Sequence, residues 1–122
     1  MSKRTYTILG IPRSGKNSMQ LLRAGNGRRF VRKSKAASKW LAEAEAQLLE
    51  QGAKPHHFRG KVRVTMVAYQ RADICDIDNI ASLVLDSLKN LAMQDDSDVV
   101  ALVAEKDIDR ARPRVEVTLE AA

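Results

Sequence analysis

Residues 61–70 carry the strongest constraint on the fold, because apolar side chains recur in them with a period of two. Val62, Val64, Met66 and Ala68 recur at every second position. Successive side chains in extended backbone point to opposite faces, so this period predicts a strand with one buried face. Such a strand needs a surrounding sheet and an apolar layer against its inner face.

Two segments with apolar residues at helical spacing can supply that layer. Residues 34–51 are expected to form one helix, with Ser34 as its N-cap and Gly52 ending it. A second helix is expected from about residue 78 to 91, with Asp78 as a capping residue. The apolar positions are Ala37, Trp40, Leu41, Ala44 and Leu48 in the first helix, and Ile80, Leu83, Val84, Leu88 and Leu91 in the second.

Four further segments are rich in residues that favour β-strands. Residues 5–9, 99–103 and 115–119 are predicted strands, and residues 21–33 contain an Ala-Gly-Asn-Gly turn typical of a hairpin. A length of 122 residues suits one domain, with 44% hydrophobic residues to fill a core. We therefore predict a single α+β domain over residues 1–122, with a mixed β-sheet and helices packed on it.

Composition also restricts the class of protein. The chain has no apolar run of the ~20 residues that a membrane span requires, and residues 1–9 lack the apolar segment of a signal peptide. We expect a cytoplasmic protein that does not enter a membrane. Cys75 is the only cysteine, which excludes an intrachain disulfide and a cysteine-based zinc site, and it is expected to be a small buried side chain.

Charge is divided between the two halves of the chain. Residues 1–42 contain 11 lysines and arginines and no acidic residue, and residues 1–63 contain 15 basic and 3 acidic residues. Residues 64–122 contain 6 basic and 12 acidic residues, which leaves a net charge of +6. A surface so rich in Lys and Arg favours a polyanion as partner, since binding phosphates releases counterions. We infer a nucleic-acid partner.

The basic half offers two candidate contact regions. Residues 10–18 form a predicted loop in which Arg13, Lys16 and Asn17 are candidates for holding DNA. This loop resembles a phosphate-binding loop, but Asn17 stands where such a loop needs a hydroxyl. The second region surrounds the hairpin and the start of the first helix, where phosphates would meet the basic side chains and the helix N-terminus. Its candidates are Arg28, Arg29, Arg32, Lys33 and Lys35.

Aspartates concentrate in the acidic half. Asp76 and Asp78 follow the strand at 61–70 and lie two residues apart, and Asp95, Asp96 and Asp98 form a second group about 20 residues later. Carboxylates at i and i+2 of extended backbone project to one side and repel unless a cation lies between them. Mg²⁺ prefers such hard oxygen ligands. Two simpler interpretations stay open: Asp78 is only a helix cap, and the second group is only a solvated turn.

These motifs resemble those of the RusA-like Holliday junction resolvases. The resemblance covers nearly the whole chain and rests on Cys-Asp-Ile-Asp-Asn-Ile at 75–80, Leu-Asp-Ser-Leu at 85–88 and Gln-Asp-Asp-Ser-Asp-Val-Val at 94–100. The loop Pro-Arg-Ser-Gly-Lys-Asn at 12–17, Lys106 and the final strand at 115–119 agree with it. One departure concerns Ser82, where the family motif usually has a lysine.

The resemblance implies a RusA-like fold and a homodimeric endodeoxyribonuclease that resolves four-way DNA junctions in recombination and repair. Asp76, Asp78 and Asp96 would be the catalytic carboxylates and would bind Mg²⁺, with Mn²⁺ as a substitute. Auxiliary roles are expected for Asn79, Asp86, Asp95 and Lys106. Two alternatives remain because of Ser82: a non-catalytic protein that binds branched DNA, and a nuclease for flaps or other branched DNA.

Overall fold

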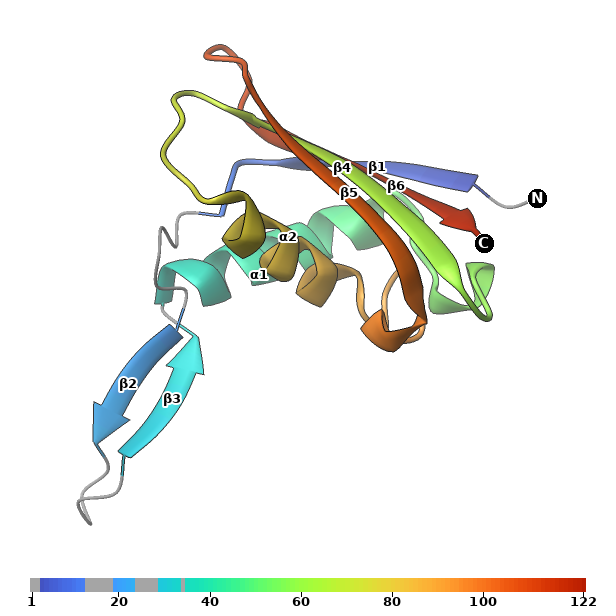
Figure 1. The fold of residues 1–122 in the computed structure, drawn as a ribbon, viewed down its shortest axis with the longest axis horizontal. Helices are drawn as coiled ribbons and strands as arrows, with labels where there is room; N and C mark the ends of the chain where they lie inside the picture. Colours follow the sequence, from blue (N-terminus) through green and yellow to red (C-terminus); the bar gives the residue numbers. More distant parts are fainter. Residues whose placement is uncertain (1–2, 13–18, 24–28, 34) are drawn as a thin grey trace.

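Two helices cover one face of a four-stranded sheet in the computed structural model (Figure 1), which describes residues 3–12, 19–23, 29–33 and 35–122. For residues 19–23 and 29–33 only the backbone is considered. The elements are β1 (Lys3–Leu9), β2 (Met19–Arg23), β3 (Arg29–Lys33), α1 (Lys35–Glu50), β4 (Val62–Gln70), α2 (Ile77–Leu88), β5 (Val99–Ile108) and β6 (Arg114–Ala121), with 3₁₀ turns at Pro55–His57 and Asp96–Asp98.

The sheet has the order β1-β6-β4-β5, in which β4 and β5 are parallel and the other pairs are antiparallel. The prediction of a single α+β domain with a mixed sheet is therefore confirmed. β2 and β3 pair separately as an antiparallel hairpin, which extends away from the sheet in Figure 1. In the described part of the chain, no helix is long and apolar enough to cross a membrane.

The alternation at 61–70 has the predicted consequence. Val62, Val64, Met66 and Ala68 are all buried against the helices, whereas Arg63 and Thr65 on the other face are exposed. The same face buries Trp40 from α1 and Leu83 from α2. β4 is therefore the central strand of the core.

Helix α1 ends as its glycine predicts. Gly52 adopts a φ of 81°, a left-handed conformation that costs glycine little. The turn is closed by the amides of Ala53 and Gly52, which donate to the carbonyls of Leu48 and Leu49 at 3.0 and 3.1 Å. This is the paired hydrogen-bond pattern of a Schellman cap. The proposed N-cap, Ser34, lies outside the described residues.

Three predicted boundaries were wrong. The N-cap of α2 is Asp76 rather than Asp78, because the carbonyl of Asp76 accepts the amide of Ile80 at 3.1 Å. The same helix ends at Leu88, before Leu91, and Asn90 follows with a left-handed φ of 65°. Strand β5 continues to Ile108 because it pairs with β4 along its whole length, well past the predicted end at 103.

The register between β4 and β5 decides which segments share an end of the sheet. Val62 is paired with Val99, and Gln70 is paired with Ile108. Helix α2 returns the chain from the end of β4 to the start of β5, as parallel neighbours require. The loop after β4 therefore lies beside the end of β5, whereas the turn at Asp96–Asp98 lies beside the start of β4.

Strand β5 is an edge of the sheet and remains unusually accessible for an apolar strand. Val100, Leu102, Val103 and Ile108 are between 43% and 51% exposed. Within the described residues, β5 is hydrogen-bonded only to β4. Its outer edge therefore offers unpaired backbone groups together with apolar side chains, the combination that favours pairing with another chain.

Candidate metal centre

Asp76 and Asp78 stand at the carboxyl end of β4, where the chain enters α2. Both side chains are exposed. In the part of the chain that the structure describes, Asp76 makes no side-chain capping hydrogen bond, and Asp78 Oδ1 accepts the local amide of Asn79 at 3.0 Å. Both therefore keep carboxylate oxygens directed to solvent at the start of a helix, where the peptide dipoles favour negative charge.

The β4–α2 loop, residues 71–76, is held by side chains of the neighbouring strands. Gln70 Oε1 accepts the amides of Ile74 and Cys75 at 3.4 and 3.1 Å. On the other side of the loop, Lys106 Nζ donates to Asp73 Oδ1 at 2.7 Å and to the Cys75 carbonyl at 3.3 Å. The residues just before Asp76 are thus attached to both parallel strands.

Cys75 adds a third attachment. Its side chain is only 6% exposed, and the thiol donates to the Pro12 carbonyl at 3.0 Å. The prediction of a buried cysteine is confirmed, and the hydrogen bond links the loop to the segment after β1. Asp76 therefore follows a residue that the fold holds on three sides.

The positive charge of Lys106 acts directly on this loop. The hydrogen bond from Lys106 lowers the pKa of Asp73 below its usual value, aided by the positive charge of the same lysine. In return, the hydrogen bond to Asp73 raises the pKa of Lys106, and the charge of Asp76 acts in the same direction. Lys106 thus remains protonated beside the aspartates, in a pair that is partly open to solvent.

Asp96 lies at the opposite end of α2. The helix has 12 residues, which corresponds to about 18 Å along its axis. Asp96 begins the 3₁₀ turn that leads into β5, and Asp95 caps this turn by accepting the Ser97 amide at 3.4 Å. Asp76 and Asp78 thus flank the first residue of α2, with Asp78 inside the helix rather than in the extended backbone that the sequence suggested, and the structure does not bring Asp96 to them within one chain. Among the described residues, no group of three metal-ligating side chains is assembled.

The auxiliary residues divide between the two ends. Asn79 is in the first turn of α2 beside Asp78, and Lys106 contacts the loop before Asp76. Asp86 lies eight residues beyond Asp78, about 12 Å along the helix. Asp95 is at the far end, 3.9 Å from the Nζ of Lys89. Ser82 is exposed on the helix one turn after Asp78, so no lysine of α2 lies near the aspartate pair.

The predicted DNA-contacting residues are only partly described. Arg29, Arg32 and Lys33 belong to β3, in the projecting hairpin, and Lys35 is exposed at the first position of α1. Arg13, Lys16, Asn17 and Arg28 lie outside the described residues. The pairing of Arg29 with Arg23 places one further basic position on the same hairpin.

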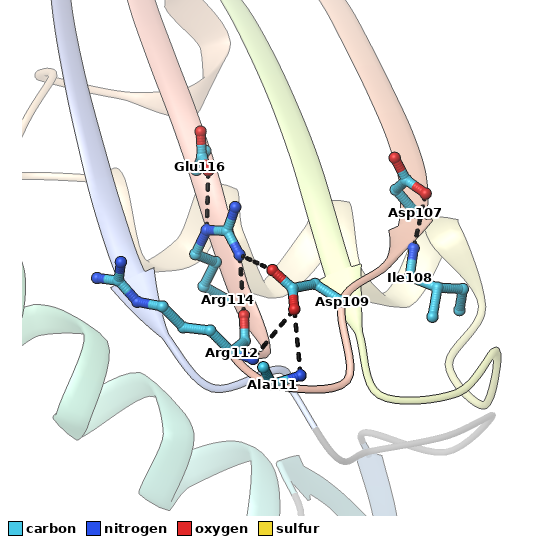
Figure 2. Close-up of polar contacts among 7 residues, drawn as sticks. All are labelled: Asp107, Ile108, Asp109, Ala111, Arg112, Arg114 and Glu116. Carbon is cyan, nitrogen blue, oxygen red and sulfur yellow. Dashed lines mark hydrogen bonds and ion pairs between the residues drawn. The ribbon is translucent and has the colours of Figure 1, made fainter.

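The turn between β5 and β6 borders this end of the sheet (Figure 2). Asp109 donates its amide to the Gln70 carbonyl at 2.8 Å, which joins the turn to the end of β4. Its carboxylate accepts the amides of Ala111 and Arg112 and forms an ion pair with Arg114 at 2.8 Å. Arg114 also binds Glu116 and lies over the ring of Tyr69. This network stiffens the frame around the loop.

Two residues that organise the loop were absent from the predicted site. Gln70 occupies a buried position of the β4 alternation and is 2% exposed. A polar side chain at a position where the period predicts an apolar one is the signal that identifies it. Asp73 opens the acidic cluster in the sequence, but its pairing with Lys106 arises from the parallel register of β4 and β5.

The fold and the site together present two solvent-facing carboxylates at the end of a strand, in a chain with a basic N-terminal half. Carboxylates of this kind are ligands for the divalent cations that assist phosphodiester hydrolysis. A protein-family model, Endodeoxyribonuclease RusA, matches residues 13–120, which is most of the chain. The chain therefore belongs to the RusA endodeoxyribonuclease family, whose members are crossover junction endonucleases and hence hydrolases. No curated protein matches the sequence.

Proposed function

We propose that this protein is a magnesium-dependent endodeoxyribonuclease that resolves four-way DNA junctions as a homodimer. The observation that carries the proposal is the placement of Asp76 and Asp78 at one strand end, with both carboxylates exposed, in a chain of the RusA family. Junction resolution is a step of recombination and repair, and a DNA substrate suits the cytoplasmic location expected from the sequence.

The donor set fits a hard divalent cation. Mg²⁺ commonly takes one or two carboxylates and completes its shell with water and substrate oxygens. Asp76 and Asp78 would hold it, and Mn²⁺ would be accepted by the same oxygens. When bound, the ion would polarise the scissile phosphate and make water a better nucleophile. The protein's own part is to hold the carboxylates in place and to keep Lys106 protonated beside them.

Asp96 fits the proposal when a second copy of the chain is considered. Its carboxylate lies at the start of β5, and the loop before Asp76 contacts the end of β5 through Lys106. If two β5 edges pair in antiparallel orientation, Val99 of one chain faces Ile108 of the other. The Asp96 of each copy then approaches the Asp76 of its partner. The exposed apolar residues of β5 support this pairing.

A two-fold dimer matches the substrate as well. A four-way junction needs two symmetric cuts, and a two-fold enzyme presents two equivalent sites. The basic positions of the N-terminal half, including Arg13, Lys16, Asn17 and Arg28, would contact backbone phosphates, which position DNA without reading its sequence. Arg29, Arg32, Lys33 and Lys35 would extend that surface along the hairpin and α1.

The first test replaces one proposed ligand. Asp78→Asn keeps the size of the side chain but removes its negative charge, so cleavage of a labelled four-way junction with Mg²⁺ is expected to fall by about two orders of magnitude. Asp107→Asn is the matched control, because Asp107 is also exposed and also accepts the amide of the next residue, at 2.7 Å. Unchanged cleavage by Asp78→Asn would contradict the metal assignment.

Substrate class is tested with the same preparation. Four-way junctions, flaps, three-way junctions and linear duplex are compared at equal concentration, with binding measured beside cleavage. We expect the four-way junction to be cut fastest and in symmetric pairs. Faster cutting of flaps would make the protein a nuclease for other branched DNA. Binding without any cutting would indicate a non-catalytic protein, for which the absence of a lysine at Ser82 would be the first explanation.

A further inference from the structure

Lys106 is placed to control the loop that presents the aspartates. It lies on β5 opposite Ala68 of β4. Ala68 is buried under the helices, so Lys106 is on the same face of the sheet. Its ammonium reaches two groups of the loop, the Asp73 carboxylate at 2.7 Å and the Cys75 carbonyl at 3.3 Å. Both contacts come within three residues of Asp76.

Side chains of both parallel strands hold the loop through its backbone groups. The amides of Ile74 and Cys75 donate to Gln70 Oε1, and the carbonyl of Cys75 accepts from Lys106. Gln70 and Lys106 stand on neighbouring parallel strands, near their carboxyl ends. The peptide before Asp76 is therefore oriented by side chains of both strands, and loss of the Lys106 ammonium removes the hydrogen bond to its carbonyl.

We propose that Lys106 is a positioning residue for divalent metal binding, holding the β4–α2 loop so that Asp76 and Asp78 share one cation. The inference rests on the metal-dependent function proposed above. Lys106 acts through Asp73 and the Cys75 carbonyl, and it stands beside the aspartates rather than among the ligands. Residues that orient metal ligands in this way commonly change metal affinity 10–100-fold when replaced.

Positioning and simple charge repulsion predict opposite results, which makes the inference testable. Lys106 carries a positive charge beside the site, so on electrostatic grounds alone its removal would strengthen cation binding. If Lys106 positions the loop, its removal weakens cation binding in spite of the lost repulsion. The sign of the change in affinity therefore separates the two roles.

The experiment titrates Mn²⁺ into the full-length protein without DNA and follows the electron paramagnetic resonance signal of the free ion. Lys106→Met is expected to raise the Mn²⁺ dissociation constant about 10-fold. Lys106→Arg, which keeps a donor and the charge, is expected to stay close to the wild type. Lys61→Met is the matched control, because it removes an exposed lysine next to the start of β4, at the other end of the sheet.

A second measurement covers the case in which Lys106→Met folds poorly. Asp73→Asn removes the ion pair but leaves Lys106 in place, and amide hydrogen exchange is followed at Ile74 and Cys75. Faster exchange at these two amides, with exchange in β4 unchanged, supports the positioning role. Unchanged exchange in Asp73→Asn, or Mn²⁺ binding by Lys106→Met as tight as or tighter than in the wild type, overturns it.

Cleavage assays separate this inference from the proposed function. Excess Mg²⁺ is expected to restore most of the junction cleavage by Lys106→Met, because a positioning defect acts on metal occupancy more than on the chemical step. If the wild type binds Mn²⁺ but cuts no branched DNA, the proposed function is wrong while the titration still decides the role of Lys106. If the wild type binds no Mn²⁺, both fail.

Discussion

At the scale of single residues, hydrogen bonds separate the aspartates that maintain the fold from those available to a ligand. Asp109 accepts two backbone amides and pairs with Arg114, and Asp73 is held by Lys106. Asp76 makes no capping hydrogen bond, and Asp78 accepts one amide of its own helix. A carboxylate already engaged by several donors would lose them on binding a metal ion, so the last two are the better candidate ligands.

Asp109 leads to a prediction about pH. The hydrogen bond from Arg114 and the backbone amides lower the pKa of Asp109 in the folded state. The resulting stability is present above the unfolded pKa of about 3.9 and is lost as pH falls through the lower folded value. Asp109→Asn should therefore melt below the wild type at pH 7, and the difference should narrow below pH ~4.

Thermal unfolding of both proteins between pH 7 and pH 2 measures this effect. Asp107→Asn is the control, since Asp107 accepts only the neighbouring amide of Ile108 in Figure 2. A difference in melting temperature between Asp109→Asn and the wild type that stayed constant down to pH 2 would show that the lost hydrogen-bond geometry, rather than the charge of Asp109, is responsible.

At the scale of elements, α2 joins the core and the site. Its inner side buries Ile80, Leu83, Val84 and Leu88 against the sheet, while its first turn carries Asp78. Because the inner side is fully packed, the helix has one rotational setting about its axis, and that setting decides where the aspartate faces. The same packing forms the crossover that makes β4 and β5 parallel.

The packing of α2 is tested by Leu83→Ala. Leu83 is 1% exposed, so its truncation leaves a cavity and should destabilise the protein by about 3 kcal/mol in urea unfolding. Ser82→Ala, at the exposed neighbouring position, should change stability by less than about 0.5 kcal/mol. Equal effects of the two variants would show that α2 is not packed as described.

At the scale of the whole molecule, the parallel crossover separates Asp96 from Asp76 and Asp78. The edge strand β5 is where we propose that a second copy of the chain binds. A single chain presents its two acidic groups beyond opposite ends of α2, a helix about 18 Å long. Two-fold pairing through β5 would reverse one chain relative to the other and thereby bring unlike ends together. The function that we propose thus requires a second copy of the chain.

A mixing experiment tests the shared site. Asp76→Asn and Asp96→Asn should each be inactive, but a mixed dimer of the two contains one intact site, formed by Asp76 of one chain and Asp96 of the other. Co-refolding the two variants should therefore restore nicking of one strand of the junction, to about a quarter of the wild-type rate if subunits mix at random.

Asp76→Asn mixed with Asp78→Asn provides the control, because each shared site then lacks one ligand from the same end of α2 and no recovery is expected. Light scattering on the same samples establishes whether the protein is a dimer. Failure of the first mixture to recover activity, in a proven mixed dimer, would mean that Asp96 does not complete the site of the partner chain.

Local patterns determined much of this protein. The period of two in β4, the helical stripes of α1 and α2 and the glycine that ends α1 depend on neighbouring residues, so they can be recognised along the chain. The placement of Asp76 and Asp78 at the start of one helix is equally local, since only one residue separates them. The division of charge likewise pointed to a polyanionic partner before any fold was known.

Only the tertiary structure decided the rest. Helix α2 begins after Asp76 and not after Asp78. Lys106 forms an ion pair with Asp73, 33 residues away in the sequence, because the register of β4 and β5 is set by packing and pairing along the whole sheet. The distance between Asp76 and Asp96 follows from the direction of the crossover, which no local pattern specifies. The sequence, with its resemblance to the family, predicted Asp76, Asp78 and Asp96 as ligands, and the parallel arrangement of β4 and β5 places Asp96 at the other end of α2 from the first two.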